Sequence, residues 1–286
     1  MRLTAEAPAK INRELRVGRI REDGFHEVLS RMVSIDLADR LTAETADMLA
    51  FTCDDPAVPL GRENLVVRAA ELLAARAGVA PRARLHLEKR SPMGGGLGGG
   101  SADAAVTLLL LSRLWDCGRA VRAALPELAA SLGSDVPFFL TGGEAEVSGR
   151  GEIVRSVDDG PPTALLLLVP PFPVPTAAVY RAYAGRGRLP ERLEVARAGR
   201  RLYLGPNDLT PAVLQVEPRM EGYLSSAAGL TDDYAVSGSG ATIVLRDAPG
   251  AREQLARRHP EARLYACTTL TREACQRRTN PEGGPP

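Results

Sequence analysis

An α+β protein built of two domains is what the sequence predicts, and three observations support this. The chain has 286 residues, enough for one large domain or two smaller ones, and 44% are hydrophobic, so a sizeable core can form. Some apolar residues alternate as in strands, whereas others recur at helical spacing. The run Gly160-Pro161-Pro162 then interrupts the pattern. We therefore expect one domain over residues 1–160 and a second over residues 161–276.

The first domain is expected to begin with strands, because residues 1–45 carry extended-type patterns around the polar turn Arg21-Glu22-Asp23-Gly24. Leu65, Ala69, Leu72 and Leu73 follow at helical spacing before Gly78, which predicts an amphipathic helix that ends there. In chain order, the elements predicted here are strands within 1–45, a helix over 64–76, a strand over 82–88, helices over 101–114 and 125–132, and a hairpin over 145–157.

The second domain is expected to open with a buried strand, because residues 164–169 are continuously apolar. The predicted elements are a strand over 164–169, a helix over 176–184, a basic irregular surface segment over 186–205, a weaker helix over 212–227, a strand, glycine turn and strand over 234–246, a short helix over 251–259 and a strand over 262–270. Residues 277–286 are polar and rich in Pro and Gly, so we expect a disordered tail.

Bulk properties exclude several classes of function. The net charge is +1, so nothing global indicates binding to nucleic acid or to an anionic membrane. The N-terminus lacks the apolar core of a signal peptide, and the most apolar run, 164–169, is far too short to span a membrane. Four scattered cysteines without CxxC or zinc-type spacing predict free thiols and no cysteine–histidine metal site. The expectation is a cytoplasmic protein.

The strongest local signal is a glycine run in which six of the seven residues from Gly94 to Gly100 are glycine. Glycine permits positive φ and removes the Cβ, so backbone amides can converge on an anion. The run lies between a predicted strand and a predicted helix, which would place those amides at a helix N-terminus. A flexible linker is the alternative, although linkers usually separate domains and contain other polar residues. The sequence therefore favours a phosphate-binding loop.

Two common nucleotide-binding patterns do not fit this run. No lysine follows the glycines, as a Walker A loop requires, and no acidic residue follows about 20 positions later, as a dinucleotide fingerprint requires. Ser101 could cap the helix or help to hold a phosphate-bound Mg²⁺. Asp103 is interpreted as a first-turn residue favoured by the helix dipole.

The segment Pro92-Met93-Gly94-Gly95-Gly96-Leu97-Gly98-Gly99-Gly100-Ser101 closely resembles the second motif of the GHMP kinases. Within that superfamily it is most similar to the 4-diphosphocytidyl-2-C-methyl-D-erythritol kinases. Further motifs agree in order and spacing over roughly residues 5–270, namely Ala7-Pro8-Ala9-Lys10-Ile11-Asn12, Asp23-Gly24-Phe25-His26, Leu132-Gly133-Ser134-Asp135-Val136-Pro137-Phe138-Phe139, Val174-Pro175-Thr176, Pro206-Asn207-Asp208-Leu209 and Ser237-Gly238-Ser239-Gly240-Ala241.

The resemblance implies a two-domain GHMP kinase fold, with an N-terminal ribosomal-protein-S5-like domain and a C-terminal ferredoxin-like α/β domain. It implies transfer of the γ-phosphoryl group of ATP, with Mg²⁺, to the 2-hydroxyl of 4-diphosphocytidyl-2-C-methyl-D-erythritol in non-mevalonate isoprenoid biosynthesis. The partner is then a small molecule, a cytidine diphosphate-linked sugar alcohol, and the protein is a monomer or a homodimer.

Matching the motifs residue by residue implies Lys10 and Asp135 as catalytic residues. Asp135 would accept or orient the proton of the hydroxyl, and Lys10 would keep that carboxylate ionised and polarise the hydroxyl. Taken singly, Asp135 could be a turn residue and Lys10 a solvated lysine. The ATP-binding residues implied are Pro92, Met93, Gly94, Gly95, Gly96, Leu97, Gly98, Gly99, Gly100, Ser101 and Ala102, with Asn64 and Lys89 near adenine. Asn64 could equally cap its helix.

The acceptor site implied by the resemblance comprises Asn12, Phe25, His26, Thr176, Tyr180, Gly238 and Ser239. His26 would hydrogen-bond the cytosine ring, and Phe25 and Tyr180 would cover its faces. A surface position for His26, core packing for Tyr180 and an ordinary hairpin turn at residues 237–241 remain alternatives.

The chain departs from the family pattern in a few places. Arg13-Glu14 puts two charges where a buried strand is expected, Phe25 replaces a more usual tyrosine, and Arg31-Met32-Val33-Ser34 is unusual for its block. Two alternatives to the cytidylyl-substrate kinase therefore stay open. One is another GHMP kinase of the homoserine or mevalonate type, and the other is a nucleotide-binding relative that has lost turnover.

Overall fold

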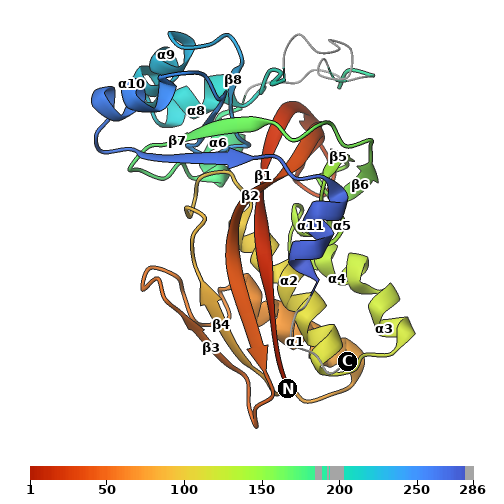
Figure 1. The fold of residues 1–286 in the computed structure, drawn as a ribbon. Coiled ribbons are helices and arrows are strands. Elements are labelled where there is room, and N and C mark those ends of the chain that lie inside the picture. The colour runs from red at the N-terminus through yellow and green to blue at the C-terminus, as the bar shows by residue number, and fades with distance from the viewer. Residues whose placement is uncertain (184–188, 192, 194–202, 281–286) are drawn as a thin grey trace.

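The computed structural model describes residues 1–183, 189–191, 193 and 203–280. Two sheets lie one above the other in Figure 1, and two long antiparallel strands rise from the lower sheet towards the upper one. These strands are β1 (Arg2–Ile20) and β2 (His26–Glu44), joined by the polar turn at residues 21–25. The predicted mixture of helices and strands is confirmed.

The lower sheet has six strands, and β2 lies at its centre. One edge of β2 pairs with β1 along its length, while the other edge pairs with β5 at Ser30–Val33 and with β4 at Arg40–Glu44. The remaining strands extend the sheet on either side: β3 is parallel to β4, and β6 is antiparallel to β5. Their bounds are β3 Ala50–Cys53, β4 Arg84–Glu88, β5 Glu144–Ser148 and β6 Ile153–Ser156.

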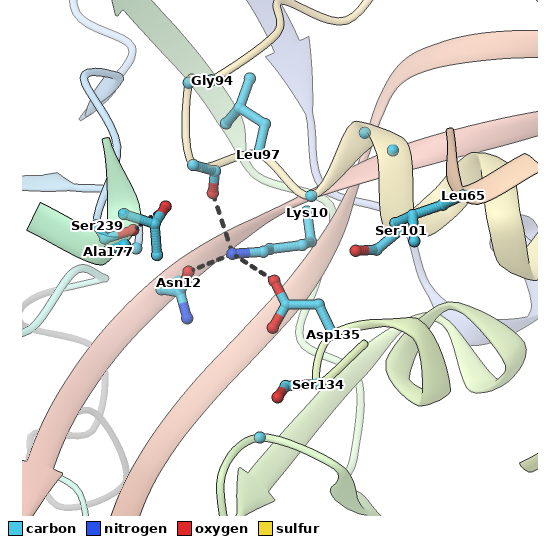
Figure 2. A pocket seen from close by; sticks show the side chains of 18 of the residues that line it. Lys10, Asn12, Leu65, Gly94, Leu97, Ser101, Ser134, Asp135, Ala177 and Ser239 are labelled. Atoms are coloured by element: carbon cyan, nitrogen blue, oxygen red, sulfur yellow. Dashed lines mark hydrogen bonds and ion pairs between the residues drawn. The ribbon is translucent and has the colours of Figure 1, made fainter. Parts of the chain in front are cut away.

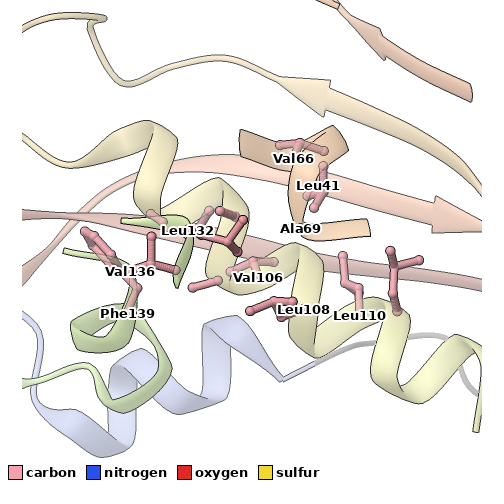
Figure 3. Close-up of a cluster of buried hydrophobic side chains, with 14 of the residues drawn as sticks. Leu41, Val66, Ala69, Val106, Leu108, Leu110, Leu132, Val136 and Phe139 are labelled. Atoms are coloured by element: carbon pink, nitrogen blue, oxygen red, sulfur yellow. The ribbon is translucent and has the colours of Figure 1, made fainter. Parts of the chain in front are cut away.

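Helices cover one face of the lower sheet and enclose its core (Figure 3). They are α1 (Leu65–Ala77), α2 (Gly99–Leu114), α3 (Arg119–Ala123), α4 (Leu125–Leu132) and α5 (Val136–Thr141). The most enclosed is α2, which is buried along most of its length and packs against β1, β2 and the neighbouring helices. The apolar stretch after the glycine run thus forms the central helix of this core.

The upper sheet has the order β10-β7-β9-β8, and all of its pairs are antiparallel. Its strands are β7 (Ala164–Val169), β8 (Tyr234–Val236), β9 (Ile243–Arg246) and β10 (Arg263–Thr268), and its helices are α6 (Thr176–Ala182), α8 (Thr210–Val216), α9 (Met220–Ala228) and α10 (Ala251–Arg258). Because β7 is buried on both faces, its sequence is continuously apolar rather than alternating.

The two sheets meet through a shared apolar core. Leu165 and Leu167 of β7 belong to the same buried cluster as Ile11 and Ile35 of the two long strands, whereas Leu166 and Leu168 face the helices of the upper sheet. The long strands therefore position the glycine run and the upper sheet against each other. The division at residue 160 stays a prediction.

Some predicted elements differ from those observed. The helix expected over 212–227 is two helices, α8 and α9, because Pro218 cannot continue a helix from Val216. Four elements were not predicted: β3, α3, α5 and a final helix, α11 (Arg272–Thr279). This last helix includes the first residues of the expected tail and packs against β1. Residues 281–286 of that tail, and most of the expected surface segment 186–205, lie outside the described residues.

Within the described ranges, the structure contains no helix that is both long and apolar enough to cross a membrane.

Candidate active site

A cavity of about 1150 Å³ opens where the glycine run meets the two sheets. Every residue predicted for the catalytic, ATP and acceptor sites lines it, with the exception of Ala102. Ala102 faces the core instead, and its amide makes an intrahelical bond to the carbonyl of Gly98 at 2.9 Å. The structure thus gathers residues as far apart in sequence as Lys10 and Ser239 into one space.

The glycine run connects β4 to α2, as predicted, and alternate residues adopt positive φ. The φ values are 69° at Gly94, 76° at Gly96 and 70° at Gly98, a region that other residues rarely adopt. A Cβ on Gly98 would lie 2.7 Å from the ring of Phe139, so this position also lacks room for a side chain. The first intrahelical bond is donated by Ala102, so the preceding amides of α2 are available to a ligand. The arrangement fits a phosphate-binding loop rather than a linker.

The glycine turn at residues 237–241, between β8 and β9, lies against the glycine run. A Cβ on Gly96 would come within 2.1 Å of the Ser237 carbonyl, and one on Gly240 within 2.3 Å of the Gly96 amide. The amide of Thr242 donates to the carbonyl of Gly95 at 3.2 Å. The backbone of the turn between β8 and β9 therefore packs directly against the backbone of the glycine run, and this contact holds the upper sheet against the run. The turn also borders the cavity.

Lys10 occupies the centre of the cavity floor, and its ammonium faces three oxygens (Figure 2). Its Nζ lies 2.7 Å from Oδ1 of Asn12, 3.0 Å from the Gly96 carbonyl and 3.5 Å from Oδ2 of Asp135. The Lys10 side chain is 4% exposed and that of Asp135 is 32% exposed. Lys10 is thus no solvated lysine, and Asp135, directly before α5, presents an accessible carboxylate beside a buried ammonium.

His26 lies at the other end of the cavity, between two tyrosines. Its ring centroid is 5.6 Å from that of Tyr180 and 5.5 Å from that of Tyr183. Its Nδ1 is 3.0 Å from the carbonyl of Gly18, which can only accept, so Nδ1 carries the proton. In the neutral ring Nε2 is then an acceptor. Burial, with a smaller contribution from the Asp135 charge, raises the pKa of Tyr180, so its phenol is protonated at neutral pH.

Phe25 and Arg150 border the same end of the cavity. The Phe25 ring is 49% exposed, and the Arg150 guanidinium lies 5.2 Å from its centroid. Nη2 of Arg150 donates to the carbonyl of Ala130 at 2.8 Å, which holds the guanidinium in place. Arg150 was not among the predicted site residues, although its position between two glycines of a predicted hairpin was a usable signal.

Ser239 and Thr176 meet between the upper sheet and the cavity, where the hydroxyl of Ser239 donates to that of Thr176 at 2.8 Å. Asn64 caps α1, since its side chain accepts from the amide of Val66 at 2.9 Å, and it also lines the cavity. The capping alternative for Asn64 is therefore confirmed, and its place near adenine stays a prediction.

Lys89 lies in a buried cluster with two carboxylates that the sequence analysis did not bring together. Its Nζ is 2.5 Å from Oδ2 of Asp39 and 2.8 Å from Oδ2 of Asp103. Oδ1 of Asp39 also accepts from the amides of Arg90 and Ser91, at 2.6 and 2.7 Å. The cluster ties the entry of the glycine run to α2 at Asp103, which lies just beyond the first turn of the helix and not in it as predicted.

The two carboxyls of this cluster have opposite pKa shifts. Burial raises the pKa of Asp103 to about 8, against the opposing effect of Lys89. Burial also disfavours ionisation of Asp39, but the Lys89 charge and hydrogen bonds from Lys89 and Ser91 outweigh it and lower the pKa of Asp39. At neutral pH the cluster therefore contains one ammonium, one carboxylate and one carboxylic acid, and has no net charge.

The unexpected charges of Arg13 and Glu14 are paired. Nη1 of Arg13 contacts Oε1 of Glu144 at 2.5 Å, and its guanidinium lies 3.9 Å above the ring of Tyr203. Glu14 pairs with Arg16 at 2.7 Å. The Arg13 contacts cross from β1 to β5 and to the segment after residue 202, whereas the Glu14–Arg16 pair lies within β1. Both charges are therefore compensated and do not disrupt the strand.

The chain has relatives among known proteins. The family model described as the GHMP kinases N terminal domain matches residues 64–143. The 4-diphosphocytidyl-2-C-methyl-D-erythritol kinase of Streptomyces avermitilis is 42% identical over 270 residues, which cover 88% of this chain and 90% of that protein. The enzyme of the same name from Pelotomaculum thermopropionicum is 41% identical, covering 90% of this chain and 94% of that protein.

Solved structures agree. A crystal structure of 4-(cytidine 5'-diphospho)-2C-methyl-D-erythritol kinase has a TM-score of 0.77 at 36% identity and covers 93% of this chain and 98% of that chain. Two more distant structures share the fold alone. A mevalonate kinase has a TM-score of 0.65 at 11% identity and covers 95% of this chain and 99% of that chain. The homoserine kinase of Cytophaga hutchinsonii has a TM-score of 0.65 at 16% identity and covers 98% of this chain and 96% of that chain. The predicted GHMP kinase fold is confirmed, and this chain belongs to the 4-diphosphocytidyl-2-C-methyl-D-erythritol kinase family of small-molecule kinases.

Proposed function

We propose that this protein transfers the γ-phosphoryl group of ATP to the 2-hydroxyl of 4-diphosphocytidyl-2-C-methyl-D-erythritol, a step of non-mevalonate isoprenoid synthesis. The observation that carries the proposal is the Lys10–Asp135 pair, which lies in one cavity with the glycine run and with His26 and Tyr180. The similarity to kinases named for this acceptor supports it. The cytoplasmic location and the choice between monomer and homodimer stay predictions.

The donor end of the cavity suits a nucleoside triphosphate. Free amides at the start of α2 and the dipole of this helix favour the phosphates. Asn64, Leu65 and Lys89 line the cavity on the side where adenine would lie. Among the described residues no group of three or more His, Cys, Asp or Glu could hold a metal. Mg²⁺ bound to ATP would neutralise phosphate charge, and the hydroxyl of Ser101, which lines the cavity, would be a protein ligand for it.

Phosphoryl transfer depends mainly on positioning and on charge. The acceptor oxygen forms a bond to the γ-phosphorus while the bond to the β–γ bridging oxygen breaks, and ADP leaves. Asp135 accepts the proton of the attacking hydroxyl. The Lys10 ammonium, held by Asn12 and the Gly96 carbonyl, stabilises the negative charge beside it.

The acceptor end suits a cytidine diphosphate. Nε2 of His26 can accept from the exocyclic amino group of cytosine, which uracil lacks. Phe25 and Tyr180 offer aromatic faces in the same cavity, and Arg150 offers a positive charge for the diphosphate. These groups distinguish the proposed acceptor from homoserine and mevalonate, which have neither a base nor a diphosphate.

A coupled ADP-release assay with three acceptors tests the proposal. We expect turnover with 4-diphosphocytidyl-2-C-methyl-D-erythritol and at least about 100-fold lower kcat/KM with homoserine and with mevalonate, because a lost set of polar contacts costs several kcal/mol. Preference for homoserine or mevalonate would support another GHMP kinase. ATP binding without turnover of any acceptor would support a non-catalytic relative.

Phe25→Ala is expected to raise the KM for the cytidylyl acceptor roughly tenfold, because it removes an aromatic face worth about 1–3 kcal/mol for each stacked base. The KM for ATP should stay within about twofold, since Phe25 is at the opposite end of the cavity from the glycine run. Steady-state kinetics with each substrate varied in turn measure both values. Ile153→Ala, another exposed apolar residue that does not line the cavity, is the matched control. Equal rises in both KM values would contradict a cytosine site.

A further inference from the structure

A chain of buried hydrogen bonds extends from Lys10 away from the reacting groups. Oδ1 of Asn12 accepts from Lys10 at 2.7 Å, and Nδ2 of Asn12 donates to the hydroxyl of Ser30 at 2.8 Å. That hydroxyl donates in turn to the carbonyl of Glu14 at 2.6 Å. Lys10 and Asn12 are each 3% exposed, and Ser30 is 0% exposed. The chain thus crosses from β1 to β2 and back without reaching solvent.

The direction of each bond follows from the number of protons available. A carbonyl can only accept, so the single hydroxyl proton of Ser30 is committed to Glu14. The oxygen of Ser30 is then left as an acceptor, and only the amino side of the Asn12 amide satisfies it. The amide oxygen of Asn12 must therefore face Lys10. A flipped amide would place its amino group against the ammonium, donor against donor.

The orientation of Asn12 matters because a lysine ammonium has three protons. Two are directed at Asn12 and at the Gly96 carbonyl, and these bonds leave the third towards Asp135. We propose that Ser30 is a positioning residue, which fixes the Asn12 amide and thereby directs Lys10 at Asp135 and the reacting oxygen. The inference rests on the proposed function in that it assigns Lys10 to phosphoryl transfer. Ser30 borders the cavity but is 0% exposed, and its hydroxyl is engaged by Asn12 and by the Glu14 carbonyl.

Kinetics test the inference through the split between kcat and KM. Ser30→Ala should lower kcat between about 10- and 100-fold, because misplacement of a catalytic group by an ångström costs that much. The KM values for ATP and the acceptor should change less than about twofold, since no binding contact is lost. Ser30→Thr, which keeps the hydroxyl, should restore most of kcat. Unchanged kcat in Ser30→Ala would overturn the proposal.

Ser34→Ala is the matched control for damage to the strand. Ser34 lies four residues further along β2, is also 0% exposed, and has its hydroxyl near the thiol of Cys275 instead of near Asn12. We expect its kcat to match the wild type, whatever its effect on thermal stability. An equal loss of kcat in both variants would mean that Ser30 has only a structural role.

A double-mutant cycle shows whether Ser30 acts through Asn12. Once Asn12→Ala has removed the amide, Ser30→Ala should lower kcat no further, within about twofold, because residues that act in one chain are not additive. Independent, multiplying losses would contradict the proposed chain.

A second readout does not depend on catalysis. Lys10 and Lys89 are the only lysines among the 36 Lys and Arg residues of the sequence, so protein labelled with ¹⁵N at lysine Nζ has two ammonium signals. Ser30→Ala should broaden the Lys10 signal through faster proton exchange and leave the Lys89 signal unchanged. If the wild type fails to phosphorylate the acceptor, the proposed function fails while this measurement still tests the chain. An unchanged Lys10 signal would overturn the role of Ser30.

Discussion

Asp135→Asn is expected to lower kcat by about 10²–10⁴-fold, the range that general acid–base catalysis contributes. Asparagine keeps the shape of the side chain but cannot accept a proton from the attacking hydroxyl. The KM for ATP should stay within about twofold, because the glycine run and the start of α2 are unchanged. The ADP-release assay with each substrate varied in turn measures both quantities.

Asp116→Asn makes the same chemical change at an exposed carboxylate outside the cavity. Asp116 has φ of 45°, a conformation that asparagine tolerates well, so the variant should fold and turn over like the wild type. Near-normal turnover of Asp135→Asn would remove Asp135 from the catalytic role. A loss shared by both variants would point to a general effect of the substitution.

Lys89→Met is expected to destabilise the protein by about 3–5 kcal/mol, since breaking a buried pair leaves an uncompensated charge. Asp39 is 0% exposed, and Lys89 is the largest of the causes that lower its pKa. In the variant Asp39 is therefore either a buried charge with no ammonium beside it in the described structure or a carboxyl that must take up a proton, and both states cost stability. The melting temperature should fall on the order of 10 °C. Calorimetric or fluorescence-monitored unfolding measures the change.

Two further variants separate charge from packing. Adding Asp39→Asn to Lys89→Met should recover much of the stability, because the uncompensated charge is then removed. Asp103→Asn alone should change stability far less at neutral pH, since burial raises the pKa of Asp103 to about 8 and the carboxyl is already uncharged. If Asp39→Asn rescues nothing, the loss in Lys89→Met comes from packing instead.

Most of the candidate site could be predicted because its residues sit in short motifs. The glycine run was recognisable from its composition. The strand predicted before it and the helix predicted after it placed the run at a helix N-terminus, as observed. Lys10, Asp135 and His26 followed from the resemblance. The structure brings all three into one cavity with the run, which sequence order alone could not establish.

The residues that support the site were not predictable. Asp39 lies 50 positions before Lys89, and Ser30 lies 18 positions after Asn12, and neither stands in a local pattern that suggests its contact. Their roles arise from strand register, which places them together only after β2 has paired with β1 and β4. Arg13 and Glu14 looked unfavourable for a similar reason, because the partners that compensate their charges are distant in sequence.

Helices with clear end signals in the sequence were predicted correctly, whereas helices with weak sequence signals were missed. Asn64 and Gly78 marked the ends of α1 as expected. The helix predicted over 212–227 missed the break between α8 and α9, although Pro218 was a visible signal for it. The polar composition after residue 271 hid α11, which is anchored by few buried side chains, among them Cys275.

The contact of Gly95 and Gly96 with Ser237 and Gly240 has a consequence for how such an enzyme can change over time. Most of this joint is polypeptide backbone, which requires glycine and a defined chain path, and the Ser237 hydroxyl adds a hydrogen bond to the Gly96 carbonyl at 3.2 Å. Substitutions elsewhere on either sheet need not preserve a matched pair of side chains across this joint. The relative placement of the two sheets can therefore persist while side chains elsewhere diverge, which is consistent with a shared fold at 11% identity to a mevalonate kinase.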